Sequence, residues 1–167
     1  AIDDDDVKLF FNNRVNKNLP YLINYTNYQD KHPELTLERD KYEKDRIMPF
    51  LNLQPESRIL DIGCGVGRWG NHILKILSNQ GMYVGADYSG NILNLAKNHF
   101  RENKNFYFCE SSFQDILLNL PGNIKQNNFN VILINGVMMY INDTDLAQCM
   151  SNLKELIAVG GRICIKE

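Results

Sequence analysis

The sequence predicts an α/β fold, in which a mainly parallel, doubly wound sheet is flanked by helices and preceded by a helical arm. From residue 58 onward, short apolar runs alternate with amphipathic stretches, as βαβ crossovers require. Before that point the chain is polar and rich in Asn and Tyr. We therefore expect an arm at residues 1–50 and one α/β core at residues 51–167, a length typical of a single domain.

The arm is predicted to contain one clear helix. Its acidic start, Asp3 to Asp6, is assigned no function, and the residues that follow are poorly periodic. Helical spacing begins within "TLERDKYEKDRIMPFL", where Leu37 and Ile47 are among the apolar positions and Thr36 is the predicted N-cap.

Five strands are predicted in the core because five short runs are rich in apolar and β-branched residues. They lie at residues 58–62, 82–86, 105–109, 130–134 and 162–166. Since parallel strands end at one edge of the sheet, ligands are expected beyond their carboxyl ends.

Amphipathic segments between these runs predict the helices. They lie at residues 68–77, 89–100, 113–119 and 143–157. Ser89 is the predicted cap of the second, and Gly160 with Gly161 is predicted to stop the last. The polar cluster at 121–128 is expected to be a surface connection.

Composition narrows the classes of partner. The 167 residues carry 18 basic and 20 acidic side chains, and the basic ones are scattered, so we expect a small-molecule partner and no nucleic acid. No apolar run approaches the roughly 20 residues that span a bilayer, and no signal pattern opens the chain. These features predict a cytoplasmic protein without a membrane partner. The four cysteines are predicted to be buried free thiols rather than metal ligands or disulfides.

A glycine-rich turn follows the first strand in "LDIGCGVGRWG". Alternating glycines between a strand and a helix favour close approach of a ligand. Gly65, Gly67 and Gly70 satisfy G-x-G-x-x-G, and Asp87 follows Gly65 by 22 residues, which also describes a dinucleotide site. Asp61, however, would repel a pyrophosphate and would favour a cationic ligand.

The same stretch resembles the first motif of the class I S-adenosylmethionine-dependent methyltransferases. Further segments follow in that family's order, namely "YVGADYSGNIL", "FYFCESSFQDI", "FNVILINGVMMYIND" and "LKELIAVGGRICIKE", so the resemblance covers about residues 51–167. It implies a Rossmann-like fold, S-adenosyl-L-methionine as cofactor with S-adenosyl-L-homocysteine as product, and methyl transfer to an O or N atom of a small molecule.

The resemblance also implies roles for particular residues. Asp87 would take the ribose hydroxyls, and Tyr88 would lie against the adenine. Ser112 and Phe113 occupy the adenine-contacting positions, although the family usually has Asp where Ser112 stands. The other predicted cofactor-binding residues are Asp61, Gly63, Cys64, Gly65, Gly67, Trp69, Asn135 and, from the arm, Tyr28 and Arg39. Tyr140 and Asn135 are the candidate catalytic residues, for orienting or deprotonating the acceptor.

Several interpretations stay open at this level. The arm together with "GVGRWG" is similar to small methyltransferases of bacterial polysaccharide and natural-product pathways, which predicts a saccharide or natural-product intermediate as acceptor. The alternatives are an NAD(P)-dependent oxidoreductase and a non-catalytic methyltransferase-like module. The family's sheet has seven strands and only five are counted here, so we expect a chain truncated after its fifth strand. The open edge would then pair with water, a neighbouring molecule or a second copy in a homodimer.

Overall fold

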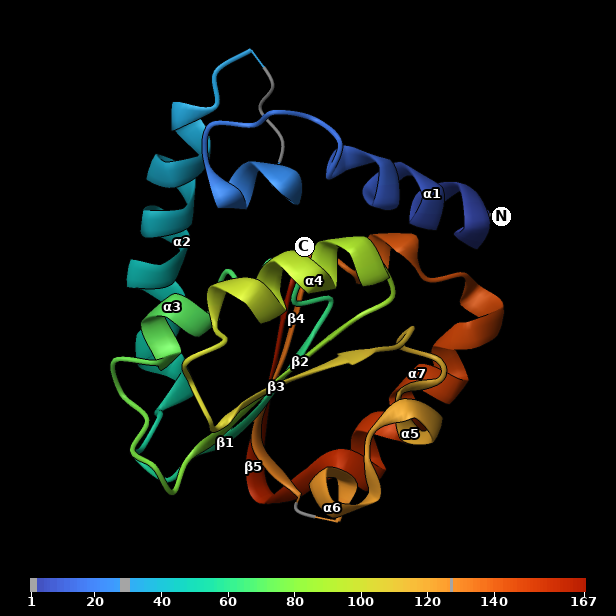
Figure 1. Ribbon diagram of the computed structural model, residues 1–167. Helices are drawn as coiled ribbons and strands as arrows, with labels where there is room; N and C mark the ends of the chain where they lie inside the picture. Colours follow the sequence, from blue (N-terminus) through green and yellow to red (C-terminus); the bar gives the residue numbers. More distant parts are fainter. Residues whose placement is uncertain (1–2, 28–30, 127) are drawn as a thin grey trace.

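The computed structural model describes residues 3–27, 31–126 and 128–167, and it confirms the α/β fold (Figure 1). Its strands form one parallel sheet in the order β3-β2-β1-β4-β5. The strands are β1 (Arg58–Ile62), β2 (Met82–Asp87), β3 (Phe106–Glu110), β4 (Phe129–Asn135) and β5 (Ile157–Lys166). The helices are α1 (Asp4–Arg14), η1 (Leu22–Tyr25), α2 (Glu34–Leu51), α3 (Gly70–Ile73), α4 (Gly90–His99), α5 (Ile116–Asn119), α6 (Gly122–Lys125), η2 (Met138–Tyr140) and α7 (Asp143–Leu156).

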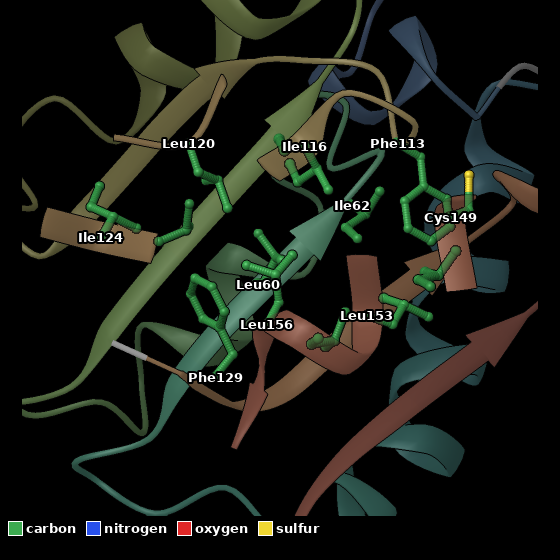
Figure 2. Packing of buried hydrophobic residues seen from close by; sticks show 14 residues of the cluster. Leu60, Ile62, Phe113, Ile116, Leu120, Ile124, Phe129, Cys149, Leu153 and Leu156 are labelled. Carbon is green, nitrogen blue, oxygen red and sulfur yellow. The ribbon is translucent and has the colours of Figure 1, made fainter. Parts of the chain in front are cut away.

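Different helices cover the two faces of the sheet, as a doubly wound fold requires. On one face, Leu60 and Ile132 pack against α5, α6 and α7, and Figure 2 shows this cluster around the central strand. On the other face, Ile59 and Leu133 pack against residues from α3 and the end of α2. Because β1 and β4 are buried on both faces, their sequences are nearly continuous apolar runs. This is why both strands could be located from the sequence.

The arm begins with a helix that the sequence analysis missed. Asp3, given no function above, is the N-cap of α1, and its carboxylate accepts from the backbone N–H groups of Asp5 and Asp6. The helix packs on the start of α4, where Asn12 Oδ1 accepts from Ser89 Oγ at 2.7 Å. Figure 1 shows α1 lying next to α4, on the side of the sheet where the chain ends. The acidic run is therefore a structural part of the arm.

Two predicted helices differ from the structure, one in its start and the other in its length. α2 begins at Glu34, with Pro33 as N-cap, and Thr36 lies in the first turn, where its hydroxyl donates to the Pro33 carbonyl. Proline fixes φ at a helical value and so begins the helix earlier than Thr36 would. The helix predicted at 68–77 shortens to α3, because the chain turns at its end and the Ser78 N–H donates to the Pro55 carbonyl.

The predicted end of the last helix is also wrong. α7 stops at Leu156, and the β-branched run that begins at Ile157 already belongs to β5. Gly160 has φ of 74° and lies where the register of β4 and β5 shifts, so it forms an irregularity inside the strand. The predicted connection at 121–128 contains the short helix α6, whose Ile124 is buried.

The fifth strand is an edge strand, as predicted. Within the described ranges β5 pairs only with β4, and its Ile163 and Ile165 are 42% and 49% exposed. The cysteine prediction holds in part. The structure describes all four as free thiols, with Cys64 and Cys149 buried but Cys109 and Cys164 only half-buried.

Candidate active site

A cavity of about 470 Å³ opens at the carboxyl ends of the strands, between the arm and the core. This volume is typical of small-molecule sites. The predicted site residues that line it are Arg39, Gly63, Cys64, Gly65, Trp69, Asp87, Tyr88, Ser112, Phe113, Asn135 and Tyr140. Asp61 and Gly67 are not among its lining residues, and Tyr28 lies outside the described residues.

The glycine turn forms the floor of the cavity beside β1. Gly63 and Gly65 have φ of 70° and 55°, a region in which residues with a Cβ are strained. A Cβ at Gly65 would also lie 2.5 Å from Thr26 Cγ2 of the arm. At Gly67 a Cβ would meet the Phe100 ring at 2.5 Å, so this glycine serves helix packing rather than the cavity wall.

Asp87 ends β2 on the wall of the cavity and is 8% exposed. Its carboxylate accepts from the backbone N–H groups of Gly65 and Ser89 at 2.8 and 2.9 Å. Burial raises the pKa of Asp87 to about 6, although these two amide bonds act to lower it. The carboxylate is thereby fixed beside the glycine turn, and its remaining lone pairs can accept from a ligand.

Asp61 lies behind the turn instead of on the cavity wall. It is 1% exposed, and its Oδ2 accepts from the Tyr83 hydroxyl at 2.6 Å. Burial raises the pKa of Asp61 to about 7 despite this hydrogen bond. The structure thus places the carboxyl group where it supports the strand beneath the turn.

Aromatic rings enclose the side of the cavity near β2. Phe11 of α1, which the sequence analysis missed, has its ring centroid 6.5 Å from that of Tyr88 and 6.0 Å from that of Tyr140. Phe113 is buried, and Ser112 Oγ donates to the Asp115 carboxylate at 3.0 Å. The arm therefore closes this side of the cavity over a largely aromatic wall.

Apart from Arg68 Nε, which lies in an ion pair with Asp40, three polar groups of cavity residues are buried without a hydrogen-bond partner in the described part of the chain. They are Trp69 Nε1, Tyr88 OH and Asn135 Nδ2. Buried polar atoms are rarely left unpaired, because desolvation is then uncompensated. The residues present thus fit a ligand that carries several hydrogen-bonding groups.

A cluster of charged side chains joins the arm to the core beside the cavity. Arg68 is absent from the predictions although it stands in "GVGRWG", and its side chain is only 9% exposed. Its Nη2 donates to Glu43 Oε2 at 2.5 Å, and its Nε lies 2.9 Å from Asp40 Oδ1. Burial acts to raise the pKa of Glu43, but hydrogen bonds from Lys166, Arg39 and Arg68 lower it to about 2. The predicted Arg39 is therefore already paired, its Nε lying 2.9 Å from Glu43 Oε1.

Glu167 fixes the loop that carries the candidate catalytic residues. Its carboxylate accepts from the backbone N–H groups of Val137, Met138 and Met139 at 3.3, 3.0 and 3.2 Å. The sequence analysis missed Glu167 and Lys166. Their place at the end of a predicted parallel strand, level with Asn135, was the signal that could have found them.

Comparison with known families decides between the two ligands that the glycine pattern allowed. Residues 53–167 match the model of a family described as a methyltransferase domain. The chain belongs to the class I S-adenosylmethionine-dependent methyltransferases. The cofactor is therefore S-adenosylmethionine, as the motifs predicted, and the dinucleotide interpretation is set aside.

The individual relatives that match this chain are distant. It is 25% identical to a demethylmenaquinone methyltransferase of Staphylococcus saprophyticus, over 80% of this chain and 54% of the relative. It is 23% identical to a phosphoethanolamine N-methyltransferase of Triticum aestivum, over 77% of this chain and 24% of the relative. A solved S-adenosylmethionine-dependent methyltransferase of Leishmania major shares the fold, with a TM-score of 0.68, 18% identity, and coverage of 95% of this chain and 58% of that one. The chain thus spans at most about half the length of these curated relatives. Among its described helices, we find none with the length and apolar character needed to cross a bilayer.

Proposed function

We propose that this protein transfers the methyl group of S-adenosylmethionine to an O or N atom of a small molecule, such as a saccharide or natural-product intermediate. The observation that carries the proposal is the cavity itself. It combines the glycine turn, the fixed Asp87 carboxylate and three buried polar groups that lack a partner among the described residues.

Each part of the cofactor is assigned to residues at the end of a particular strand or at the turn that follows it. Asp87 would accept from the ribose hydroxyls, and Tyr88, Ser112 and Phe113 would surround the adenine. The amino-acid end of the cofactor would lie over the turn, near Gly65 and Arg68, where the guanidinium can pair with its carboxylate. Asp61 would act indirectly, by holding the strand under the turn through Tyr83.

The bound cofactor supplies a methyl group on a sulfonium, so that little acid or base assistance is needed. The chain then has to hold the acceptor in line and keep water away. Phe11 and the rest of the arm would exclude water, while the Asn135 amide would orient the acceptor. Tyr140 would accept a hydrogen bond from a hydroxyl or amine acceptor and help its proton leave.

The names of two relatives support a small-molecule acceptor. One is called a demethylmenaquinone methyltransferase and the other a phosphoethanolamine N-methyltransferase. They differ from each other in acceptor, and a saccharide stays a proposal to be tested.

Calorimetric titration with S-adenosylmethionine, S-adenosylhomocysteine and NAD⁺ tests the first half of the proposal. We expect binding of the first two alone; a chain that binds neither would refute it. A product-release assay across hydroxyl and amine acceptors then tests transfer. Cofactor binding with no turnover on any acceptor class would favour the non-catalytic module.

A further inference from the structure

Three cations on the cavity wall converge on one buried carboxylate. Arg39 Nε and Lys166 Nζ each lie 2.9 Å from Glu43 Oε1, and Arg68 Nη2 lies 2.5 Å from Glu43 Oε2. The three come from α2, from the turn after β1 and from the end of β5. All three line the cavity, while Glu43 stands behind them and is 8% exposed.

The cluster around Glu43 carries more positive than negative charge. Its cations outnumber its carboxylates four to two, the members being Arg39, Lys44, Arg68 and Lys166 against Asp40 and Glu43. Lys44 is 2% exposed, and its ammonium is held by Asp40 and the Arg68 carbonyl. The cluster itself therefore has two more cations than carboxylates, and the buried Asp61 also interacts electrostatically with Arg68 and Lys44.

The other carboxylates of the cavity wall are engaged elsewhere. Asp87 accepts from two backbone amides and Glu167 from three. The charge of Asp4 interacts electrostatically with Tyr88, at the β2 end of the cavity. Because these amide donors are neutral, the Asp87 and Glu167 carboxylates keep their charge, and Glu167 offsets part of the positive charge beside Lys166.

Two of these cations keep donors free for a ligand. The ammonium of Lys166 has three N–H donors and the guanidinium of Arg39 has five, but the structure gives each only Glu43 as a partner in the part of the chain it describes. Arg39 and Lys166 are also more exposed than Arg68, with side-chain exposures of 62% and 27% against 9%. They are thus the cations that a second ligand can reach.

The strand order separates these donors from the cofactor's ribose. Asp87 ends β2 and Lys166 ends β5, three strands away, which is about 14 Å at the usual strand spacing. A cofactor held over β2 and the β1 turn leaves the ends of β4 and β5 for the acceptor. Lys166 lies there in register with Asn135, the candidate for orienting that acceptor.

We propose that the methyl acceptor carries an anionic group, a phosphate or a carboxylate, that Lys166 and Arg39 bind. The inference rests on the proposed function, because it takes the cofactor's single carboxylate to pair with Arg68 and so to leave the free N–H donors of Lys166 and Arg39 to a second ligand. These two cationic donors then favour an anionic acceptor over a neutral one of the same shape.

The experiment uses the protein saturated with S-adenosylhomocysteine, so that the cofactor's own carboxylate site is filled. Inorganic phosphate and, separately, acetate are titrated in by calorimetry at constant ionic strength, since salt screens the interaction. We expect at least one anion to bind the wild-type complex. Its dissociation constant should rise about tenfold or more in Lys166→Gln and in Arg39→Gln, each of which loses a charged donor.

The matched control is Arg46→Gln. Arg46 lies on the same helix as Arg39, donates to the Tyr42 hydroxyl and is not among the cavity residues. We expect this variant to bind the anion like wild type. An equal loss in all three variants, or no anion binding to the wild-type complex, would overturn the anionic acceptor and leave the proposed function standing. Failure of S-adenosylhomocysteine itself to bind would instead count against the proposed function.

Discussion

Replacing Asp87 by Ala is the sharpest test of how the cavity binds its cofactor. The change removes the carboxylate that would accept from two ribose hydroxyls. A hydrogen bond to a charged group contributes about 1.5–3 kcal/mol, so two bonds amount to roughly 3–6 kcal/mol. We therefore expect the dissociation constant of S-adenosylhomocysteine to rise by a factor of about 10² to 10⁴.

The structure adds a second effect to this estimate. The same carboxylate holds the N–H groups of Gly65 and Ser89, so Ala also loosens the glycine turn. Asp87→Asn keeps the shape and one acceptor oxygen, and should lose only part of the affinity. Asp45→Ala, which removes an exposed carboxylate of α2 paired with Lys41, is the control and should bind like wild type.

Isothermal calorimetry at pH 7.5, with thermal unfolding to show that each variant is folded, measures the effect. The pH dependence provides an independent check. Because the pKa of Asp87 is raised to about 6, its carboxyl group is protonated below that pH and cannot accept from both hydroxyls. Wild-type affinity should fall as the pH is lowered through about 6, and this dependence should vanish in Asp87→Ala. A folded Ala variant that binds within threefold of wild type would refute the assignment.

Three other perturbations follow from the arm and the buried charges. Deleting residues 1–31 removes α1 and Phe11 from the cavity wall, and should weaken cofactor binding about tenfold by calorimetry. Unchanged affinity with retained activity would show that the arm has no part in binding or catalysis. Tyr83→Phe should lower the free energy of unfolding in urea by about 1–3 kcal/mol, since a buried bond to Asp61 is lost. This loss should be larger at pH 8 than at pH 5.5, because Asp61, with a pKa of about 7, is charged only at the higher pH; an equal loss at both would contradict that pKa. Glu43→Ala should cost about 3–5 kcal/mol near pH 7, against under about 0.5 kcal/mol for the exposed Glu38→Ala. Because the pKa of Glu43 is lowered from 4.5 to about 2, its stabilisation is complete above pH 4.5, and the gap between the two variants should narrow as the pH falls towards 2.

The sequence predicted those parts of the fold that depend on local pattern. β1, β2 and β4 were located to within a residue or two because burial on both faces leaves apolar runs, and the edge strand β3 was located from its aromatic residues. Asp87 and the glycine turn were predicted from another local pattern, because their spacing along the chain fixes their geometry. The start of β5 was missed because Gly160 stands inside the strand rather than at the end of a helix.

The parts that were missed depend on contacts between distant segments. α1 has a polar sequence with little amphipathic pattern, and it is held by the cap at Asp3 and by Asn12 on α4. In the sequence, Arg68 stands in the glycine turn and Lys166 at the end of a predicted strand, but nothing there links either of them to Glu43. Only the tertiary structure brings them to Glu43, which no periodicity or motif spacing could predict.

The ion pair between Glu43 and Lys166 has a consequence for the order of folding. It joins residues 123 positions apart, and Lys8 reaches Glu110 across 102. Contacts that close such long loops form late, because the chain entropy they cost is recovered only once the intervening sheet exists. During synthesis the arm leaves the ribosome before the core, yet α1 has no surface to dock on until α4 has formed, and Glu43 of α2 lacks Lys166 until β5 is in place. We therefore expect the arm to be the last part of this chain to gain protection from proteolysis during refolding, and the cavity to be completed only in that final step.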